Sequence, residues 1–416
     1  MQQSLPRRPP LSPLLHAHPP QGLGLVVVIP CHDEPALIDS LTTLRNCDPP
    51  QCDVEVIIVI NDGEDATPEV VARNRQTLQE VRHWIAGHAL PWLHFHVIYQ
   101  SGLPRKHAGV GLARKIGMDE ACLRLEEVGK PEGIIACFDA DTLCQPNYFR
   151  ALVTHFRNHP KCQACSIRFE HPLSGNSFAP SVYEAIAAYE LHLRYFIDAQ
   201  RWAGHPHALH TIGSAMAVRA DAYRKQGGMN KRQAGEDFYF LHKFTPLGSV
   251  MELNATTVIP SPRPSHRVPF GTGKAVSDLT QGRKIAKTYN PESFRMLKLF
   301  FEKIRELPPT PPPHLPSTLS GFLELVHFEQ KWQELKKHTA TEASFRQRFF
   351  RWFNAFMVMK FLHHSRQDGY PDVPVVEAAA WLLDAVGQPT SEVDIRSLLL
   401  AFRRLDLLGI FPLPTA

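Results

Sequence analysis

The sequence predicts an α/β protein in which a mostly parallel central sheet has helices on both faces and is followed by a helical C-terminal extension. Over the first 170 residues, short apolar runs rich in β-branched residues alternate with longer segments of helical periodicity. This is the pattern of a parallel sheet that is covered on both faces. After a proline-rich segment at residues 307–316, the periodicity is helical to the end of the chain.

The individual elements follow from the apolar pattern. Strands are predicted at residues 23–29, 54–60, 94–99, 133–138 and 249–259. In the same region, helices are predicted at 37–44, 68–85, 108–128 and 181–200, and a Pro/Gly/Ser-rich loop at 260–274. The helices predicted beyond the proline-rich segment are 318–337, 342–364, 374–387 and 391–408.

Length and composition predict a globular protein of two or three domains. The chain has 416 residues, of which 44% are hydrophobic and 21% charged, and its formal net charge is only +4. So small a charge argues against a dedicated nucleic-acid-binding protein. The predicted organisation is a flexible lead-in at 1–22, an α/β domain at 23–275, a helical connection at 276–306, a proline-rich linker at 307–316 and a helical region at 317–416.

The sequence favours a cytoplasmic protein. No segment reaches the roughly 20 apolar residues that span a bilayer, and residues 1–20 lack the apolar core of a signal peptide. The eight cysteines are therefore expected to be reduced thiols. Cys162 and Cys165 have the spacing of a zinc or redox pair, but no matching second pair accompanies them. The favoured interpretation is that these cysteines are two small residues flanking a strand.

Polar residues follow three of the predicted strands. The first strand runs into residues 30–34 (PCHDE), the second into 61–63 (NDG) and the fourth into 139–141 (DAD). In an open parallel sheet, ligands bind beyond the carboxyl ends of the strands. Carboxylates gathered there repel one another unless a positive group joins them. A divalent cation that holds a diphosphate is such a group.

Asp139 and Asp141 are the sharpest feature of this kind. In an extended backbone, residues i and i+2 point to the same side. Two hard oxygen donors on one side suit Mg²⁺ or Mn²⁺ that is also bound by phosphate. A polar strand terminus without a metal is the common alternative, but the preceding buried strand in an α/β array favours the metal site.

Together the motifs resemble the family 2 glycosyltransferases and their relatives with the GT-A fold. VVVIPCHDE resembles the strand-one signature of that family, and VIIVINDGEDAT resembles its second segment, with Asn61 in place of the first Asp. GLARKIG at 111–117 resembles a G-x-A-R-N-x-G helix, and FDADT matches the D-x-D strand end. GSAMAVR at 213–219, followed by Gly227-Gly228 and by Gly235-Glu236-Asp237, resembles the block that ends in E-D. The resemblance covers about residues 23–275.

The resemblance implies a glycosyltransferase that takes sugar from a nucleotide-diphosphate donor, with UDP the commonest base in the family. It implies that Glu34 and Asp62 hold the nucleoside, that Asp139 lies near ribose and metal, and that Asp141 ligates the metal. The donor-binding residues expected on this basis are Pro30, Glu34, Asp62, Lys106, Arg114, Asp139, Arg263 and Arg267. A solvated basic surface is the alternative interpretation of Lys106.

On the acceptor side, the resemblance implies that Asp237 is the general base and that Glu236 binds or orients the acceptor. A carboxylate within hydrogen-bond reach of the acceptor hydroxyl can remove its proton as the hydroxyl attacks. Acidic residues also favour the first turn of a helix, which is the alternative interpretation of this pair. The two interpretations are compatible.

His266 lies in a segment, VIPSPRPSHR, that looks similar to one completing the metal site in several GT-A enzymes, including retaining ones. The resemblance therefore implies His266 as a third metal ligand, beside Asp139 and Asp141. Family 2 members usually invert the anomeric centre, so an inverting transfer with Asp237 as base is favoured. A retaining transfer with His266 on the metal stays open as the alternative.

Three rival classes are less well supported. A nucleotidyltransferase has a G-x-G-T-R-L signature and a dinucleotide-binding dehydrogenase has G-x-G-x-x-G after strand one, whereas this chain has PCHDE. A non-catalytic protein with the same fold is the third, and the two intact acidic pairs speak against it. The resemblance implies a hydroxyl acceptor, either a carbohydrate or a lipid-linked molecule, and the sequence does not select between them.

The basic aromatic segment at 342–364 has two interpretations. It can lie on the inner face of a membrane and bring the protein to a lipid-linked acceptor. It can also pack against the rest of the protein, which is the favoured interpretation because apolar residues surround much of the helix.

Overall fold

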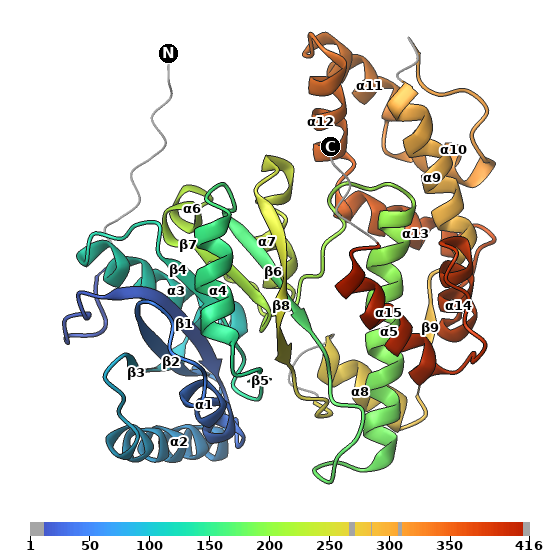
Figure 1. Cartoon of the computed structure of the whole chain (residues 1–416). Helices are drawn as coiled ribbons and strands as arrows, with labels where there is room; N and C mark the ends of the chain where they lie inside the picture. The colour runs from blue at the N-terminus through green and yellow to red at the C-terminus, as the bar shows by residue number, and fades with distance from the viewer. Residues whose placement is uncertain (1–11, 266–270, 284, 307–309, 411–416) are drawn as a thin grey trace. The chain divides into compact units, whose positions relative to one another are not determined.

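The computed structural model describes residues 12–265, 271–283, 285–306 and 310–410 (Figure 1). The chain forms two compact units. The first contains the described residues up to Phe169 together with Thr211–Phe244 and Ser249–Ser261. The second contains Glu170–His210, Thr245–Gly248 and the described residues from Pro262 onwards. The units interleave along the chain, and residues 170–210, expected in the α/β domain, group with the C-terminal helices.

An eight-stranded sheet forms the centre of the first unit, in the order β3-β2-β1-β4-β7-β6-β8-β5. Strands β3, β2, β1 and β4 pair in parallel, as do β6 and β8, whereas β7 is antiparallel to β4 and β6, and β5 is antiparallel to β8. The predicted mostly parallel sheet is confirmed. The strands are β1 (Leu23–Cys31), β2 (Asp53–Gly63), β3 (Leu93–Leu103), β4 (Ile134–Cys137), β5 (Leu143–Cys144), β6 (Ala164–Phe169), β7 (Met216–Arg219) and β8 (Val250–Ile259).

All five predicted strands are present in this sheet, and its three other strands were not predicted. Strands β5, β6 and β7 have only two, six and four residues. Runs this short do not establish a periodicity that distinguishes a strand from other structure. The sequence therefore reveals the parallel half of the sheet, β3 to β4, and only β8 of the half that contains the antiparallel pairs.

The helices of the first unit are α1 (Leu37–Arg45), α2 (Pro68–Gly87), α3 (Val110–Glu127), α4 (Tyr148–Asn158), α6 (Ala220–Lys225) and α7 (Glu236–Leu241). Helix α3 packs on β1 and β2 through Gly117. A Cβ atom on Gly117 would lie 2.4 Å from Cγ1 of Val28 and 3.1 Å from Cγ2 of Val59. The absence of a side chain thus allows α3 to approach the sheet closely, which fixes the residues near its N-terminus beside the strand ends.

The second unit is helical. Its elements are α5 (Pro180–Trp202), η1 (Thr245–Leu247), α8 (Thr272–Thr280), β9 (Lys287–Thr288), α9 (Pro291–Glu306), α10 (Ser317–Leu325), α11 (Phe328–Lys337), α12 (Glu342–Trp352), α13 (Ala355–Gln367), β10 (Val373–Pro374), α14 (Val375–Ala385) and α15 (Ile395–Leu408). Its core is strongly aromatic. Phe300 has ring contacts with Phe301, Phe349 and Phe353 at centroid separations of 5.5–5.8 Å, a geometry that adds to the stabilisation from burial alone.

Two predicted C-terminal helices are each divided into two, which corrects the prediction of continuous helices over 318–337 and 342–364. The first breaks at His327, whose φ of 53° is left-handed. The second breaks at Asn354, whose side chain accepts hydrogen bonds from the N–H groups of Phe356 and Met357 and so caps α13. The loop predicted at 260–274 is also too long, because α8 begins at Thr272.

The aromatic stripe of the segment 342–364 is largely buried. Phe345, Phe349 and Phe353 are at most 3% exposed, whereas Phe356 is 37% exposed. Burial of these three rings agrees with the favoured interpretation, in which the segment packs within the protein. Among the described residues, no helix is long and apolar enough to cross a membrane.

Helix α5 contains a buried ion network. Glu190 is fully buried and accepts hydrogen bonds from Nε of Arg194 at 2.8 Å, from Nη2 of Arg403 at 2.7 Å and from the N–H of His171 at 2.8 Å. Burial alone would raise the pKa of Glu190, but Arg194, His171 and Arg403 together hold it well below its ordinary value. Since Arg403 belongs to α15, this network joins the last helix to α5.

All eight cysteines are free thiols. Cys162 and Cys165 are both buried, and burial raises the pKa of each. A buried thiol with a raised pKa is a poor nucleophile and a poor metal ligand. The interpretation of this pair as packing residues at the start of β6 agrees with these surroundings.

Candidate active site

The carboxyl end of β1 leads into a sharp turn. Asp33 has a φ of 48°, and its N–H donates to Oδ1 of Asn74 at 3.0 Å. Glu34 is 4% exposed and accepts a hydrogen bond from the N–H of Ala36 at 3.0 Å. Two carboxylates therefore lie at this strand end, and Pro30 is buried within the strand just before them.

Asp62, at the end of β2, is 1% exposed and strongly hydrogen-bonded. Its Oδ1 accepts from the Ser101 hydroxyl at 2.6 Å and the Gly102 N–H at 3.1 Å, and its Oδ2 accepts from the Tyr99 hydroxyl at 3.0 Å and the Asn74 amide at 3.3 Å. Burial alone would raise the pKa of Asp62, but these donors hold it below its ordinary value. Asp62 is therefore an ionised carboxylate that fixes the end of β3 to the end of β2.

Asn74, a fully buried residue of α2, joins the ends of β1 and β2. Besides its contacts with Asp33 and Asp62, its amide donates to the carbonyl of Asn61 at 3.0 Å. Sequence reasoning missed Asn74, Tyr99 and Ser101. The only available signals were an amide on the apolar side of a helix and two hydroxyl residues at a strand end, and both are common features.

Asp139 and Asp141 lie in a tight turn after β4. The N–H of Thr142 donates to the carbonyl of Asp139 at 3.1 Å, so the expectation of an extended backbone from 139 to 141 is wrong. The hydroxyl of Ser40 donates to the carbonyl of Ala140 at 3.0 Å and fixes the turn to α1. The Asp139 side chain is 37% exposed and Asp141 is half-buried, so both carboxylates border solvent.

Arg114 of α3 connects the two acidic motifs. Its Nη2 donates to Oδ1 of Asp139 at 2.6 Å, and its Nη1 donates to Oε1 of Glu236 in α7. The Arg114 side chain is 1% exposed and that of Glu236 is 4% exposed. Burial alone would lower the pKa of Arg114, but Asp139 and the neighbouring acidic groups raise it above its ordinary value. A permanent cation thus lies between the D-x-D turn and the E-D helix.

Asp237 follows Glu236 and shares this environment. Burial raises the pKa of Asp237, Arg114 opposes that rise, and Asp139 adds to it. The Oδ1 atom accepts from the N–H of Phe238 at 2.7 Å, so the carboxylate also satisfies a donor in the first turn of α7. A half-buried carboxylate whose pKa is shifted towards neutrality is a candidate proton acceptor.

Three glycines make this arrangement possible. A Cβ atom on Gly213 would lie 3.0 Å from Nη2 of Arg114 and 3.3 Å from Oδ2 of Asp237. A Cβ atom on Gly111 would lie 2.2 Å from the carbonyl oxygen of Arg232. Gly235 has a φ of 70° directly before α7, a conformation that side chains disfavour. The glycines of the three motifs therefore permit close approach or a left-handed turn.

Besides Arg114, Lys106 is the predicted donor-binding cation that belongs to the described part of the first unit. Lys106 is exposed in the loop after β3, and Arg105 beside it is 80% exposed and contacts Asp65. Arg263 belongs to the second unit. His266 and Arg267 lie outside the described residues. The structure thus unites Asp139, Arg114, Glu236 and Asp237 in one place within the first unit.

Residues 26–227, just under half of the chain, match the family model described as Glycosyl transferase family 2. No curated protein matches the chain. Among solved structures, S. aureus TarS 1-349 in complex with UDP-GlcNAc is similar at 15% sequence identity, with a TM-score of 0.41, 94% of this chain and 90% of that chain covered.

Two further structures illustrate the range of similarity. Mannosyltransferase PcManGT from Pyrobaculum calidifontis, in complex with GDP-Man and Mn²⁺, has 15% identity and a TM-score of 0.38, with 97% of this chain and 91% of that chain covered. Glucosyl-3-phosphoglycerate synthase from Mycobacterium tuberculosis has 13% identity and a TM-score of 0.36, with coverages of 63% and 80%.

The mixed, mostly parallel sheet and the family match together indicate a glycosyltransferase. In sequence, residues 26–227 are similar to glycosyl transferase family 2. The matched segment begins within β1, contains β2 to β4, α3 with Arg114, and the D-x-D turn, and ends before α7.

Proposed function

We propose that the protein transfers a sugar from a nucleotide-diphosphate donor, with UDP the first choice of nucleotide, to a hydroxyl group of a carbohydrate or lipid-linked acceptor. The observation that carries this proposal is the position of Arg114 between Asp139 and Glu236. This contact brings together the D-x-D turn, to which we assign the donor, and the E-D helix, to which we assign the acceptor. A transferase must hold both reactants at one place in order to convert a bimolecular reaction into an effectively unimolecular one.

On the donor side, we assign Glu34 and Asp62 to the nucleoside, and Lys106, Arg263 and Arg267 to the diphosphate. The assignment of Asp62 requires a ligand donor to share or replace one of four protein donors. Arg114 is buried and already contacts two carboxylates. We therefore assign Arg114 to positioning Asp139 and Glu236 rather than to direct contact with phosphate.

We assign a divalent cation, Mn²⁺ or Mg²⁺, to Asp139 and Asp141, with His266 as a third ligand. The two aspartates suit such an ion because they offer carboxylate oxygens from one turn at the border of solvent. When bound, the ion would offset the negative charge of the departing diphosphate.

For the transfer itself, we assign the role of base to Asp237. The acceptor oxygen forms a bond to the anomeric carbon, and the bond from that carbon to the diphosphate oxygen breaks with its electron pair. The acceptor proton passes to the carboxylate of Asp237, and Glu236 orients the acceptor. The raised pKa of Asp237 supports this role, because a base works best when its pKa approaches the working pH. An in-line attack of this kind inverts the anomeric centre.

We place the reaction in the cytoplasm, because eight free thiols are typical of a reducing compartment. Contact with a membrane through 342–364 would involve Phe356, which is 37% exposed, rather than the buried rings of the stripe. A lipid-linked acceptor would give such contact a purpose.

The test is thermal unfolding of the full chain with UDP-, GDP- and dTDP-sugars, each with Mn²⁺, Mg²⁺ or EDTA. A ligand at a hundred times its dissociation constant adds about 2.7 kcal/mol of stability. We expect a metal-dependent increase of the unfolding midpoint with the sugars of one nucleotide, and loss of that increase in Asp141→Ala. If no donor raises the midpoint of the wild-type protein with either metal, the proposed donor site is wrong.

A further inference from the structure

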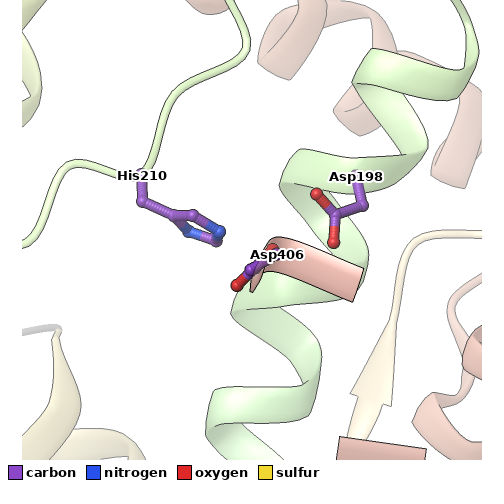
Figure 2. A group of neighbouring side chains, drawn as sticks. All are labelled: Asp198, His210 and Asp406. Atoms are coloured by element: carbon purple, nitrogen blue, oxygen red, sulfur yellow. The ribbon is translucent and has the colours of Figure 1, made fainter. Parts of the chain in front are cut away.

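A second group of potential metal ligands lies in the helical unit, apart from the residues assigned to sugar transfer. It consists of Asp198 of α5, His210 and Asp406 of α15, and one ligand atom from each lies within 4.8 Å of the other two. Figure 2 shows the imidazole of His210 pointing from its loop towards the two carboxylates. Among the described residues, no other group of His, Cys, Asp and Glu has this geometry.

The group is buried. Asp198 is fully buried, His210 is 7% exposed and the Asp406 side chain is 10% exposed. Two carboxylates and an imidazole rarely lie together away from water without a cation that offsets their charge. The question is therefore which cations the surroundings supply.

Two arginines contact the carboxylates, each through a single oxygen. Nη1 of Arg201 lies 3.5 Å from Oδ1 of Asp198, and Nη1 of Arg194 contacts Oδ2 of Asp406. Arg194 is shared with Glu190, at 2.8 Å. Each aspartate thus has a second oxygen with which to ligate an ion, and an arginine that orients the carboxylate. Hydrogen-bonded partners of this kind orient the ligands in many metal sites.

We propose that Asp198, His210 and Asp406 form a binding site for a divalent transition metal, with Zn²⁺ preferred over Mg²⁺ and Ca²⁺. Imidazole nitrogen suits Zn²⁺, whereas Mg²⁺ and Ca²⁺ take oxygen ligands. Bond lengths of about 2.0–2.2 Å in a tetrahedral Zn²⁺ site place neighbouring ligand atoms about 3.3–3.6 Å apart. Ligand atoms of this group that are as far apart as 4.8 Å would therefore have to move more than about 1 Å closer when the ion binds. Three protein ligands leave a fourth position for water.

Such an ion would join three segments that are distant in sequence. It would connect α5 through Asp198, the segment after α5 through His210, and helix α15 through Asp406. The site is independent of the proposed sugar site, because none of its ligands belongs to the D-x-D turn or to the E-D helix. Its predicted effect is to stabilise the attachment of α15.

The test is a titration of the metal-free full chain with Zn²⁺, followed by calorimetry. The Asp141→Ala variant is used as the background in order to remove the proposed donor-site ion. We expect one equivalent of Zn²⁺ to bind in this background. Adding His210→Ala should weaken that binding at least about tenfold. The unfolding midpoint should rise with Zn²⁺ only when His210 is present.

His207→Ala is the matched control, because His207 has the same 7% exposure and belongs to the same segment but not to the group. It should bind Zn²⁺ like the background. Asp406→Asn, which keeps the shape of the side chain, should weaken binding as His210→Ala does. Far-UV circular dichroism in EDTA establishes that each variant is folded.

Two results would overturn the proposal. The first is the absence of stoichiometric Zn²⁺ binding in the Asp141→Ala background. The second is Zn²⁺ binding that neither His210→Ala nor Asp406→Asn changes. Either result would mean that the arginines alone offset the charge of the group. Neither bears on the donor site, which is tested by nucleotide-sugar binding in a protein with Asp141 intact.

Discussion

At the scale of single residues, Arg114 has a large predicted effect on stability. It contacts Asp139 and Glu236 while almost fully buried, and removal of one member of a buried ion pair leaves an uncompensated charge. We expect Arg114→Leu to lower the free energy of unfolding by about 3–5 kcal/mol. Urea denaturation measures this directly.

Arg105→Leu is the control for Arg114→Leu. Arg105 contacts Asp65 from a side chain that is 80% exposed, so its loss should change stability by about 1 kcal/mol or less. Equal effects of the two substitutions would contradict the role assigned to the buried contacts of Arg114.

We predict that Asp237, the proposed base, lowers the free energy of unfolding at neutral pH. Its pKa is raised in the folded protein, so its ionised form costs folding free energy at any pH above that raised value. We expect Asp237→Asn to have a higher unfolding midpoint than the wild-type protein at pH 7 to 8. The gain should disappear as the pH falls below 3.8, the ordinary pKa of the group, because both side chains are then neutral. A variant that is less stable at pH 7.5 would contradict the assigned direction of the shift.

Among single residues, the sequence predicts the charged positions and not their partners. Asp139, Glu236 and Asp237 were recognisable from motif order, and Arg114 from the motif of its helix. That Arg114 contacts both acids, and that Asn74 joins two strand ends, depends on contacts between residues 12 to 122 positions apart. Neither periodicity nor local spacing contains that information.

At the scale of secondary-structure elements, the position of α3 depends on Gly117. An added Cβ would lie 2.4 Å from Val28, so the helix would have to move away from the sheet. We expect Gly117→Ala to cost about 1–3 kcal/mol and to weaken donor binding, because Arg114 lies on the same helix. Urea denaturation and nucleotide-sugar binding measure the two effects.

Gly87 supplies the control for this substitution. It ends α2 with nothing near the position of an added Cβ, so Gly87→Ala should be neutral or stabilising by up to about 1 kcal/mol. Destabilisation of similar size at both glycines would show that close packing is not the reason for Gly117.

The helix breaks show what an element-scale prediction lacks. The apolar pattern at 342–364 continues through Asn354, so periodicity alone predicts one helix. Asn354 instead caps α13 with its side chain, and His327 takes a left-handed conformation between α10 and α11. Neither residue is a glycine or a proline, so the usual sequence signals of a break were absent.

At the scale of the whole molecule, the buried network around Glu190 predicts acid sensitivity of the helical unit. The pKa of Glu190 lies well below its ordinary value of 4.5. The ionised network therefore gives its full stabilisation above pH 4.5, and this contribution is lost as the pH falls through the lowered pKa. We expect Glu190→Gln to cost about 3–5 kcal/mol at pH 7. The difference from the wild-type protein should shrink on acidification.

Glu329 provides a comparison, because it lies on the exposed side of α11. Glu329→Gln should leave the unfolding curve within about 0.5 kcal/mol of the wild-type protein at every pH. Circular dichroism at 222 nm follows both variants. A pH-independent cost of Glu190→Gln would contradict the linkage to its ionisation.

The division of the molecule into units was the least accessible property from sequence. The fold class follows from buried strands such as 54–60 and from the strand-end carboxylates. The interleaving of the two units along the chain does not follow from the sequence, because the pattern of α5 is that of any amphipathic helix. Only its partners reveal that its buried Glu190 joins it to Arg403, 213 positions away.

The most direct test of the central claim compares donor binding with transfer in two variants. Calorimetric titration with the nucleotide-sugar selected by thermal unfolding, in Mn²⁺, measures binding, and release of nucleotide with water as acceptor measures the chemical step. We predict that Asp237→Asn binds the donor as tightly as the wild-type protein but releases nucleotide at least about a hundredfold more slowly, and that Asp141→Ala loses metal-dependent binding. Release by Asp237→Asn at the wild-type rate, or metal-dependent binding by Asp141→Ala, would contradict the account.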